Sequence, residues 1–130
     1  MSLTVGLRGH FESVVTETNT AAAVGSGSLP VFATPMMVAL MEGAAVNALE
    51  GYLAEGESSV GTHMDISHDS ATPVGIKVWA EAELTAVDDR ALTFSVTAYD
   101  EAGPIGKGRH IRFLVQSERF LAKAQKKTAQ

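Results

Sequence analysis

The sequence lacks cysteine altogether. Without cysteine there is no disulfide, no thiolate nucleophile and no cysteine-ligated metal, so these kinds of site are excluded. A hydrophobic run of the roughly 18 residues that a membrane span needs is also missing, because Glu42 and Asn47 interrupt the longest apolar stretch. The N-terminal stretch has neither the charged nor the apolar region of a signal peptide. These absences predict a cytoplasmic protein with no membrane partner.

An excess of basic residues is missing as well. The formal net charge is −5, which speaks against a nucleic-acid partner. The charge is uneven, since residues 101–130 carry seven basic and two acidic side chains. Such a segment is either a solvated surface or a rim that attracts an anionic ligand. The chain does contain 45% hydrophobic and 19% charged residues, which is typical of a globular protein and predicts a single domain over residues 1–130.

Hydrophobic periodicity predicts one long helix and a series of strands. The helix is predicted to begin at Thr34, a good N-cap residue, with Pro35 at the first helical position, and to continue to residue 52 or 53. The preceding stretch 24–30 is rich in Gly and Ser, which predicts a flexible loop or lid. Alternation predicts the strands. The predicted strands span 9–18, 60–68, 76–86, 92–98 and 105–115, and a short polar helix spans 117–127.

The predicted long helix is apolar nearly all round, so other elements must cover it. Antiparallel strands with one apolar face each can wrap such a helix. The predicted architecture is therefore α+β, with a long central helix wrapped by a curved antiparallel sheet, the arrangement called a hotdog fold.

One acid, Glu42, lies in the middle of this apolar helix. Burial of a carboxylate without a partner costs free energy and raises a carboxyl pKa toward the range of a general base. We interpret Glu42 as a functional residue. The alternative is a buried acid held by structural hydrogen bonds or placed at a subunit contact. Its neighbours within about 60° on a helical wheel are all apolar: Pro35, Val38, Ala39, Ala45, Val46 and Leu49.

Two further residues can border a site with Glu42. His68 ends a predicted strand on the parity of that strand's apolar residues, the face expected to meet the helix, although a core-facing histidine is more often structural. Thr34 is explained as an N-cap. Its hydroxyl also lies at the positive end of the helix dipole, where developing negative charge is stabilised.

The other histidines carry less information. His63 has the parity opposite to His68 and is expected on the outer face of the sheet, while His10 and His110 have no comparable context. No histidine and acid spacing matches that of a metal site, so no metal is predicted.

Three stretches of the chain resemble a known family. They are "VFATPMMVALMEGAAVNAL" (31–49), "SVGTHMDISHDSATPVG" (59–75) and "IGKGRHIRFLV" (105–115), followed by "ERFLAKAQKKT" (118–128). In order and spacing they resemble the fluoroacetyl-CoA thioesterase family of hotdog proteins. The resemblance implies a thioester hydrolase that acts on a small acyl group carried on coenzyme A, with coenzyme A as part of the substrate and no cofactor.

The resemblance also implies a set of site residues. The Thr, Glu and His that are catalytic in the family fall on Thr34, Glu42 and His68. The backbone N–H of Gly61 falls where the family binds the thioester carbonyl, and Arg112 matches an arginine near the acyl pocket. Glu42 is then a general base or a nucleophile, and Thr34 a positioning group or a nucleophile. The family further implies a homodimer or a dimer of dimers with sites across the interface.

Three more residues are predicted to contact the substrate. Phe32 belongs to the first motif, and Lys107 and Arg109 on the basic last strand are candidates for binding coenzyme A phosphates. The chain departs from the family before Val31, where Ser28 or Leu29 stands in place of an expected aromatic residue. This difference favours a general short-chain acyl-CoA hydrolase over one selective for a fluorinated acyl group.

Two other functions remain open from the sequence. One is hydration or dehydration of an acyl-CoA on the same fold, although such chemistry usually uses an Asp and His pair. The other is a non-catalytic module that binds acyl-CoA or another small ligand, in which Glu42 and His68 form a satisfied buried pair.

Overall fold

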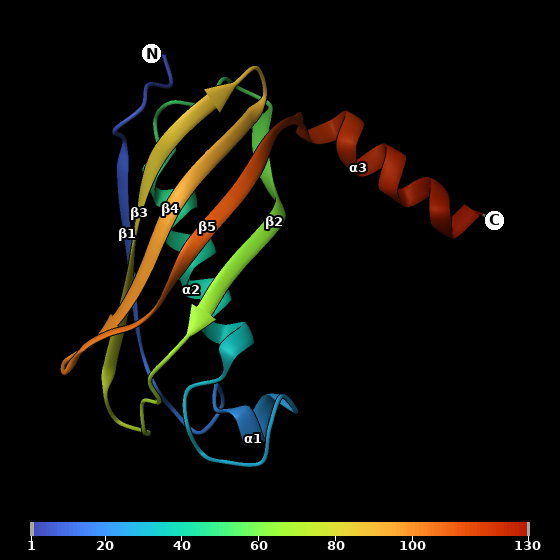
Figure 1. Cartoon of the computed structure of the whole chain (residues 1–130). Helices are drawn as coiled ribbons and strands as arrows, with labels where there is room; N and C mark the ends of the chain where they lie inside the picture. The colour runs from blue at the N-terminus through green and yellow to red at the C-terminus, as the bar shows by residue number, and fades with distance from the viewer. Residues whose placement is uncertain (1, 130) are drawn as a thin grey trace.

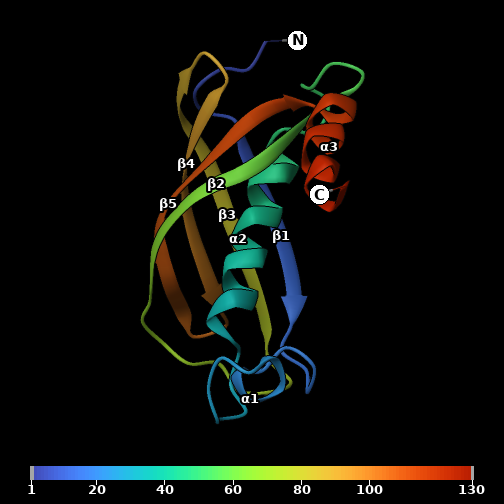
Figure 2. The same ribbon diagram turned by 90° about the vertical axis from the view of Figure 1, so that its right-hand side faces the viewer.

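The computed structural model describes residues 2–129 and contains one antiparallel sheet, one long helix and shorter helices at either end. The sheet has the strand order β1-β3-β4-β5-β2. Figures 1 and 2 show α2 lying along one face of the curved sheet. The elements are β1 (Arg8–Val14), α1 (Ala21–Val24), α2 (Thr34–Ala48), β2 (Glu57–His68), β3 (Lys77–Asp88), β4 (Ala91–Asp100), β5 (Gly103–Gln116), α3 (Ser117–Gln125) and the 3-10 helix η1 (Lys126–Ala129).

The core lies between α2 and the inner face of the sheet. Strand residues alternate between buried and exposed positions, because successive side chains point to opposite faces. The buried positions of β3 and β4 meet the buried face of the helix, and each large apolar side chain placed there contributes roughly 1.5–3 kcal/mol. The helix contributes Met37, Leu40, Met41, Ala44, Ala45 and Ala48, and the two strands contribute Val78, Ala80, Ala82, Leu84, Leu92, Phe94, Val96 and Ala98.

The edge strand β1 approaches the helix backbone very closely at Gly9. A methyl group at this position would overlap the carbonyl oxygen of Ala44 and the amide nitrogen of Ala48. The next residue, His10, donates its backbone N–H to Asn47 Oδ1 at 2.9 Å. Glycine is therefore required here by the contact between strand and helix.

The ends of α2 differ from the prediction. Thr34 is the first helical residue and not the N-cap; the N-cap is Ala33, which makes no side-chain capping bond. The Thr34 hydroxyl is therefore free to bond elsewhere. The helix ends at Ala48, several residues before the predicted end, and Gly51 takes a left-handed φ of 82° in the turn that follows.

The segment between β1 and α2 is held by several hydrogen bonds, whereas the sequence predicted a flexible loop over part of it. Strand β1 ends at Val14, earlier than predicted, and Asn19 bonds back to the carbonyl of Val14. The short helix α1, which the sequence did not predict, is capped by Thr20. Backbone bonds from Ala21 and Ala22 tie α1 to the stretch before α2.

A β-bulge in β2 reverses part of the predicted facing. Gly61 pairs with Arg112 and His63 pairs with Ile111, so one extra residue, Thr62, is accommodated between them. Gly61 therefore shares the inner face with Met64, whereas strict alternation had placed them on opposite faces.

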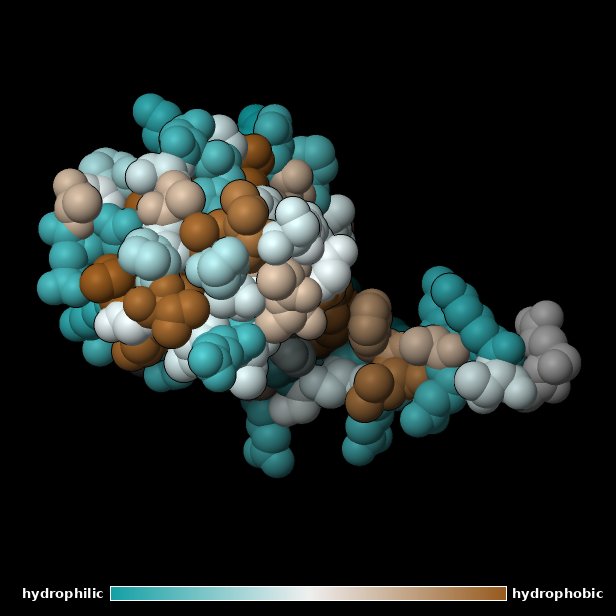
Figure 3. All heavy atoms as spheres, turned by 90° about the horizontal axis from the view of Figure 1, so that it is seen from below, coloured by the Kyte–Doolittle hydropathy of each residue, from teal (hydrophilic) through white to brown (hydrophobic). Residues whose placement is uncertain are grey.

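The C-terminal helix α3 projects away from the body of the protein (Figures 1 and 3). Its Phe120 and Leu121 are exposed, and Figure 3 shows hydrophobic and hydrophilic residues mixed along it. Within residues 2–129, no helix combines the length and the hydrophobicity that a membrane crossing requires.

Candidate active site

The Glu42 carboxylate lies at the surface of α2 that faces β2 and the end of β5. Its Oε2 atom is 3.9 Å from Nη1 of Arg112, an ion pair in which the arginine is buried and the acid is 41% exposed. The sequence predicted a buried acid, but in the single chain Glu42 is only half buried, because its apolar neighbours Pro35, Ala39 and Val46 point away from the sheet.

Three side chains converge above Gly61. A methyl group at Gly61 would lie 2.7 Å from Glu42 Oε2, 3.0 Å from His110 Cε1 and 3.4 Å from Arg112 Nη1. The missing side chain of Gly61 therefore leaves the room in which the carboxylate sits. The bulge at Thr62 creates this arrangement, because it turns Gly61 to the inner face.

His110 belongs to this cluster, and sequence reasoning missed it. Its side chain is fully buried on β5, with only 1% of the residue exposed. The parity that makes Arg112 inward-facing also applies to His110, two residues earlier. That shared parity is the signal from which the position of His110 could have been predicted.

A second cluster lies at the N-terminal end of α2. The Thr34 hydroxyl is 2.8 Å from Nδ1 of His68, which ends β2. A cavity of about 250 Å³ adjoins this pair and is lined also by Phe32 on one side and by residues of α1 and the following loop on the other. The stretch predicted as a lid thus borders the cavity through Ser26.

The His68 imidazole is held in its neutral form. Burial lowers the pKa of His68 below its ordinary value, against the raising effects of the Ser70 backbone and the Asp69 charge. Its Nε2 atom is buried and has no hydrogen-bond partner within the described residues. A buried polar atom without a partner costs free energy, which is typical of a site where function outweighs stability.

The two clusters border the same side of α2 but are separated along it. Glu42 follows Thr34 by eight residues, which is about 12 Å at the rise of an α-helix. In one chain, Glu42, Gly61 and Arg112 therefore form one group, and Thr34 and His68 form another.

Lys107 and Arg109 face away from both groups, although Lys107 is adjacent in sequence to Gly106, which pairs with His68. Both are exposed residues on the outer face of β5, whereas His110 and Arg112 point inward. The structure thus does not bring them together with Glu42 in a single chain.

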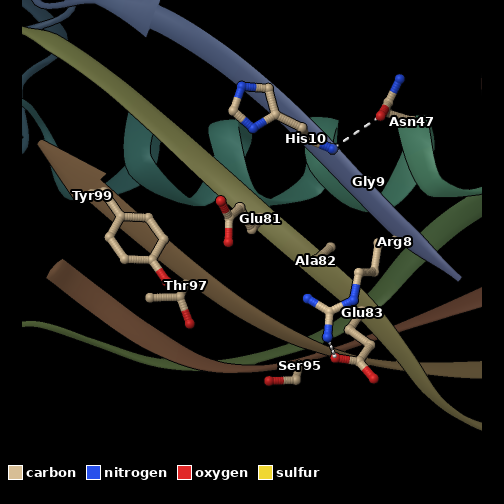
Figure 4. Close-up of a pocket in the computed structure, with 10 residues that line it drawn as sticks. All are labelled: Arg8, Gly9, His10, Asn47, Glu81, Ala82, Glu83, Ser95, Thr97 and Tyr99. Carbon is tan, nitrogen blue, oxygen red and sulfur yellow. Dashed lines mark hydrogen bonds and ion pairs between the residues drawn. The ribbon is translucent and has the colours of Figure 1, made fainter. Parts of the chain in front are cut away.

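A larger cleft lies elsewhere. It measures about 410 Å³ and is lined by polar side chains of β1, β3 and β4 (Figure 4), including Arg8 and Glu83, which form an ion pair at 3.0 Å. It contains none of the predicted site residues. Within the described residues, no three His, Asp or Glu side chains are gathered in a way that could hold a metal ion.

Known proteins identify the family. A family model described as fluoroacetyl-CoA-specific thioesterase matches residues 15–118. The chain belongs to the fluoroacetyl-CoA-specific thioesterase family. The fluoroacetyl-CoA thioesterase of Streptantibioticus cattleyicolor is 46% identical over 98 residues, which are 75% of this chain and 70% of that protein. The family resemblance that the sequence motifs indicated is confirmed.

Solved structures confirm the hotdog fold. The fluoroacetyl-CoA thioesterase FlK superposes with a TM-score of 0.91 at 38% identity, covering 98% of each chain. A thioesterase superfamily member from Thermus thermophilus superposes with a TM-score of 0.88 at 28% identity, covering 97% of this chain and 93% of that one. A hot-dog-like protein from Thermanaerovibrio acidaminovorans superposes with a TM-score of 0.85 at 21% identity, covering 96% of this chain and 93% of that one. At this identity the match shows the fold alone.

The buried His110 and the partly buried His68 predict a pH-dependent stability. Burial lowers the pKa of both His68 and His110 from the ordinary value of 6.5. The folded state therefore binds fewer protons than the unfolded state just below that value, and stability falls as the pH falls. We expect the free energy of unfolding, measured by urea titration, to be constant above about pH 7.5 and to decrease from pH 6.5 toward pH 5.

The contribution of each histidine can be separated. His68→Gln and His110→Gln should each flatten part of this decrease. A decrease of the same size in the wild type and in both variants would contradict the prediction.

Proposed function

We propose that this protein hydrolyses small acyl-CoA thioesters, with Glu42 as the general base. The observation that supports this proposal most strongly is the position of the Glu42 carboxylate, beside the Gly61 backbone and the buried Arg112 guanidinium. A carboxylate, a backbone strand and a buried cation together supply a base and a site for developing negative charge. The proposal agrees with the relatives, which are named as thioesterases, and with the FlK mutant structure that holds acetyl-CoA.

In the proposed reaction, Glu42 accepts a proton from water as the water oxygen attacks the thioester carbonyl carbon. The carbonyl oxygen becomes an oxyanion, which the Gly61 N–H stabilises. When the tetrahedral intermediate collapses, the carbon–sulfur bond breaks and the thiolate of coenzyme A leaves. The products are a carboxylic acid and coenzyme A, whose thiolate takes up a proton.

Thr34 and His68 act together in this proposal. Because the Thr34 hydroxyl bonds Nδ1 of His68, the ring is oriented, and its buried Nε2 atom, which has no partner within the described residues, is proposed to contact the substrate. His68 is proposed to act as a proton relay: one ring nitrogen gives its proton to the departing thiolate while the other takes up the proton that Glu42 accepted from water, so that the ring is neutral before and after the step. Phe32 is proposed to contact the acyl group.

A single turnover in ¹⁸O-labelled water tests the role of Glu42. Direct attack by water labels the first product, whereas unlabelled product would identify Glu42 as a nucleophile.

We propose further that two chains pair and that the site is completed between them. Strand β2 is an edge strand of the sheet, and the exposed face of α2 beside it is apolar at Pro35, Ala39 and Val46. A second chain on this face would bury Glu42. It would also place its own residues beside the two clusters, which lie about 12 Å apart along α2 in one chain. Light scattering should give twice the 13.7 kDa of one chain; a mass of one chain would contradict the pairing.

The substrate is proposed to be a short-chain acyl-CoA. The cavity beside Thr34 measures about 250 Å³, and the stretch before Val31 carries Ser28 and Leu29 without an aromatic residue. We expect thiol release from acetyl-, propionyl- and butyryl-CoA, with fluoroacetyl-CoA not preferred by a large factor.

A panel of acyl-CoA substrates tests the function. Thiol release is followed with a chromogenic thiol reagent, and loss of the enoyl absorbance with crotonyl-CoA is followed in parallel. Thiol release at a rate proportional to enzyme confirms the proposal. Loss of the enoyl absorbance without thiol release indicates a hydratase. Coenzyme A that raises the melting temperature, with no turnover of any thioester, indicates a binding module.

A further inference from the structure

The buried His110 has a defined tautomer. Its Nδ1 atom is 2.8 Å from the backbone carbonyl oxygen of His63, and since a carbonyl oxygen only accepts, Nδ1 carries the hydrogen. Its Nε2 atom is 3.1 Å from Nη1 of Arg112. A guanidinium only donates, so Nε2 must offer its lone pair. Both contacts are satisfied together only by a neutral imidazole protonated at Nδ1.

The Arg112 guanidinium forms hydrogen bonds through all three of its nitrogen atoms. Nε donates to Ser59 Oγ at 2.8 Å, Nη2 donates to the Ser59 carbonyl at 3.0 Å, and Nη1 donates to His110. The second N–H of Nη1 is left for Glu42, whose Oε2 is 3.9 Å away. Ser59 therefore fixes one edge of the guanidinium, and His110 fixes the nitrogen that faces the acid.

We propose that His110 is a positioning residue for thioester hydrolysis, which holds Arg112 Nη1 toward Glu42 and the space over Gly61 through its neutral imidazole. This inference rests on the proposed function of Glu42 and Arg112. His110 does not touch the reacting atoms in this scheme. It acts through Arg112, and no other polar side chain is bonded to the Nη1 atom within the described residues.

Protonation of His110 would reverse its effect. A hydrogen on Nε2 would face the N–H groups of Arg112, and two positive charges would be adjacent. The titratable groups around the ring are Arg112 on β5, Glu42 on α2 and His63 on β2, while β4 contributes the uncharged Phe94. Burial lowers the pKa of His110 most, the Arg112 charge lowers it further, and the His63 carbonyl and the Glu42 charge oppose this.

A double-mutant cycle tests the proposal. His110→Leu removes the acceptor, and Arg112→Met removes the donor. If His110 acts through Arg112, we expect His110→Leu to lower kcat/KM for acetyl-CoA about tenfold in the presence of Arg112 and less than twofold in the Arg112→Met background, since contacting residues are coupled by about 2- to 150-fold. His110→Gln, which keeps an acceptor, should retain most of the activity. The proposal would be overturned if the activity losses of His110→Leu and Arg112→Met multiplied in the double variant. It would also be overturned if His110→Gln lost as much activity as His110→Leu.

A second measurement does not depend on activity. Imidazole ¹⁵N NMR of the wild type at pH 7 should find His110 neutral and protonated at Nδ1, and Arg112→Met should raise its pKa. A cationic ring, the other tautomer or an unchanged pKa overturns the positioning contact. A wild type that hydrolyses no thioester overturns the proposed function instead, while the NMR result still decides whether His110 holds Arg112. His10→Gln, an exposed histidine, is the control for both measurements.

Discussion

Replacement of Glu42 by Gln is expected to lower kcat for acyl-CoA hydrolysis by about 10²–10⁴-fold, the usual contribution of a general base. The substitution keeps the shape of the side chain but removes its ability to accept a proton. It also removes the charge that faces Arg112 at 3.9 Å. Because Glu42 is 41% exposed within one chain, the pair contributes little to the stability of a single chain.

Glu50→Gln is the matched control. Glu50 is an exposed acid just after the C-terminal end of the same helix, so its replacement makes the same chemical change without touching Gly61 or Arg112. Thiol release from acetyl-CoA is measured for all three proteins at saturating substrate. Equal rates for wild type and Glu42→Gln would contradict the assignment of Glu42 as the general base, independently of the roles of the other site residues.

The second large effect is expected on stability. Gly9→Ala should destabilise the protein by about 3 kcal/mol, the upper part of the range for overpacked positions. The new methyl group meets the backbone of Ala44 and Ala48, which cannot move aside as a flexible side chain can. Strand β1 or the end of α2 must therefore shift, and the bond from the His10 N–H to Asn47 is strained with it.

Thermal unfolding followed by circular dichroism measures this effect, which corresponds to a drop in Tm of about 10 °C for a domain of this size. Ser13→Ala, on the same strand and partly exposed, is the control and should change Tm by less than about 2 °C. A Gly9→Ala variant as stable as wild type would mean that the edge strand is free to move away from the helix.

The order of the main strands and the long helix could be predicted because their signals are local. Period-two alternation in 76–86 and 92–98 depends only on neighbouring residues, and β3 and β4 have the predicted facing. The predicted helix N-cap was wrong because a threonine near the start of a helix can occupy either the cap or the first turn. Thr34 is in the first turn, and its hydroxyl bonds His68, which is distant in the sequence.

The environment of Glu42 could not be predicted from a helical wheel. A helix that is apolar nearly all round gives no indication of which stripe faces the sheet, and Ala39 and Val46 proved exposed while Ala45 is buried. The wheel identified the acid as unusual. Only the packing of α2 against β1, β3 and β4 established that it faces outward and toward β2.

The facing of Gly61 and the burial of His110 depend on contacts far apart in the sequence. A bulge is specified by how two strands pair, and the residue types between 60 and 64 do not predict its position. The role of His110 depends on a carbonyl of β2, 47 residues earlier in the chain. Both features depend on the pairing of β2 with β5. The periodicity of each strand predicts that strand by itself and gives no information about its register with the other.

The bulge at Thr62 places one residue of β2 outside the regular pairing with β5. If β2 ran without a bulge and kept Thr62, the residue opposite Arg112 would be Thr62 in place of Gly61, and its side chain would enter the space now taken by the Glu42 carboxylate. Loss of Thr62 would instead leave Gly61 opposite Arg112 and His63 opposite Ile111, so Gly61 would still face inward. The site should therefore tolerate a shorter strand at this point better than a straightened one.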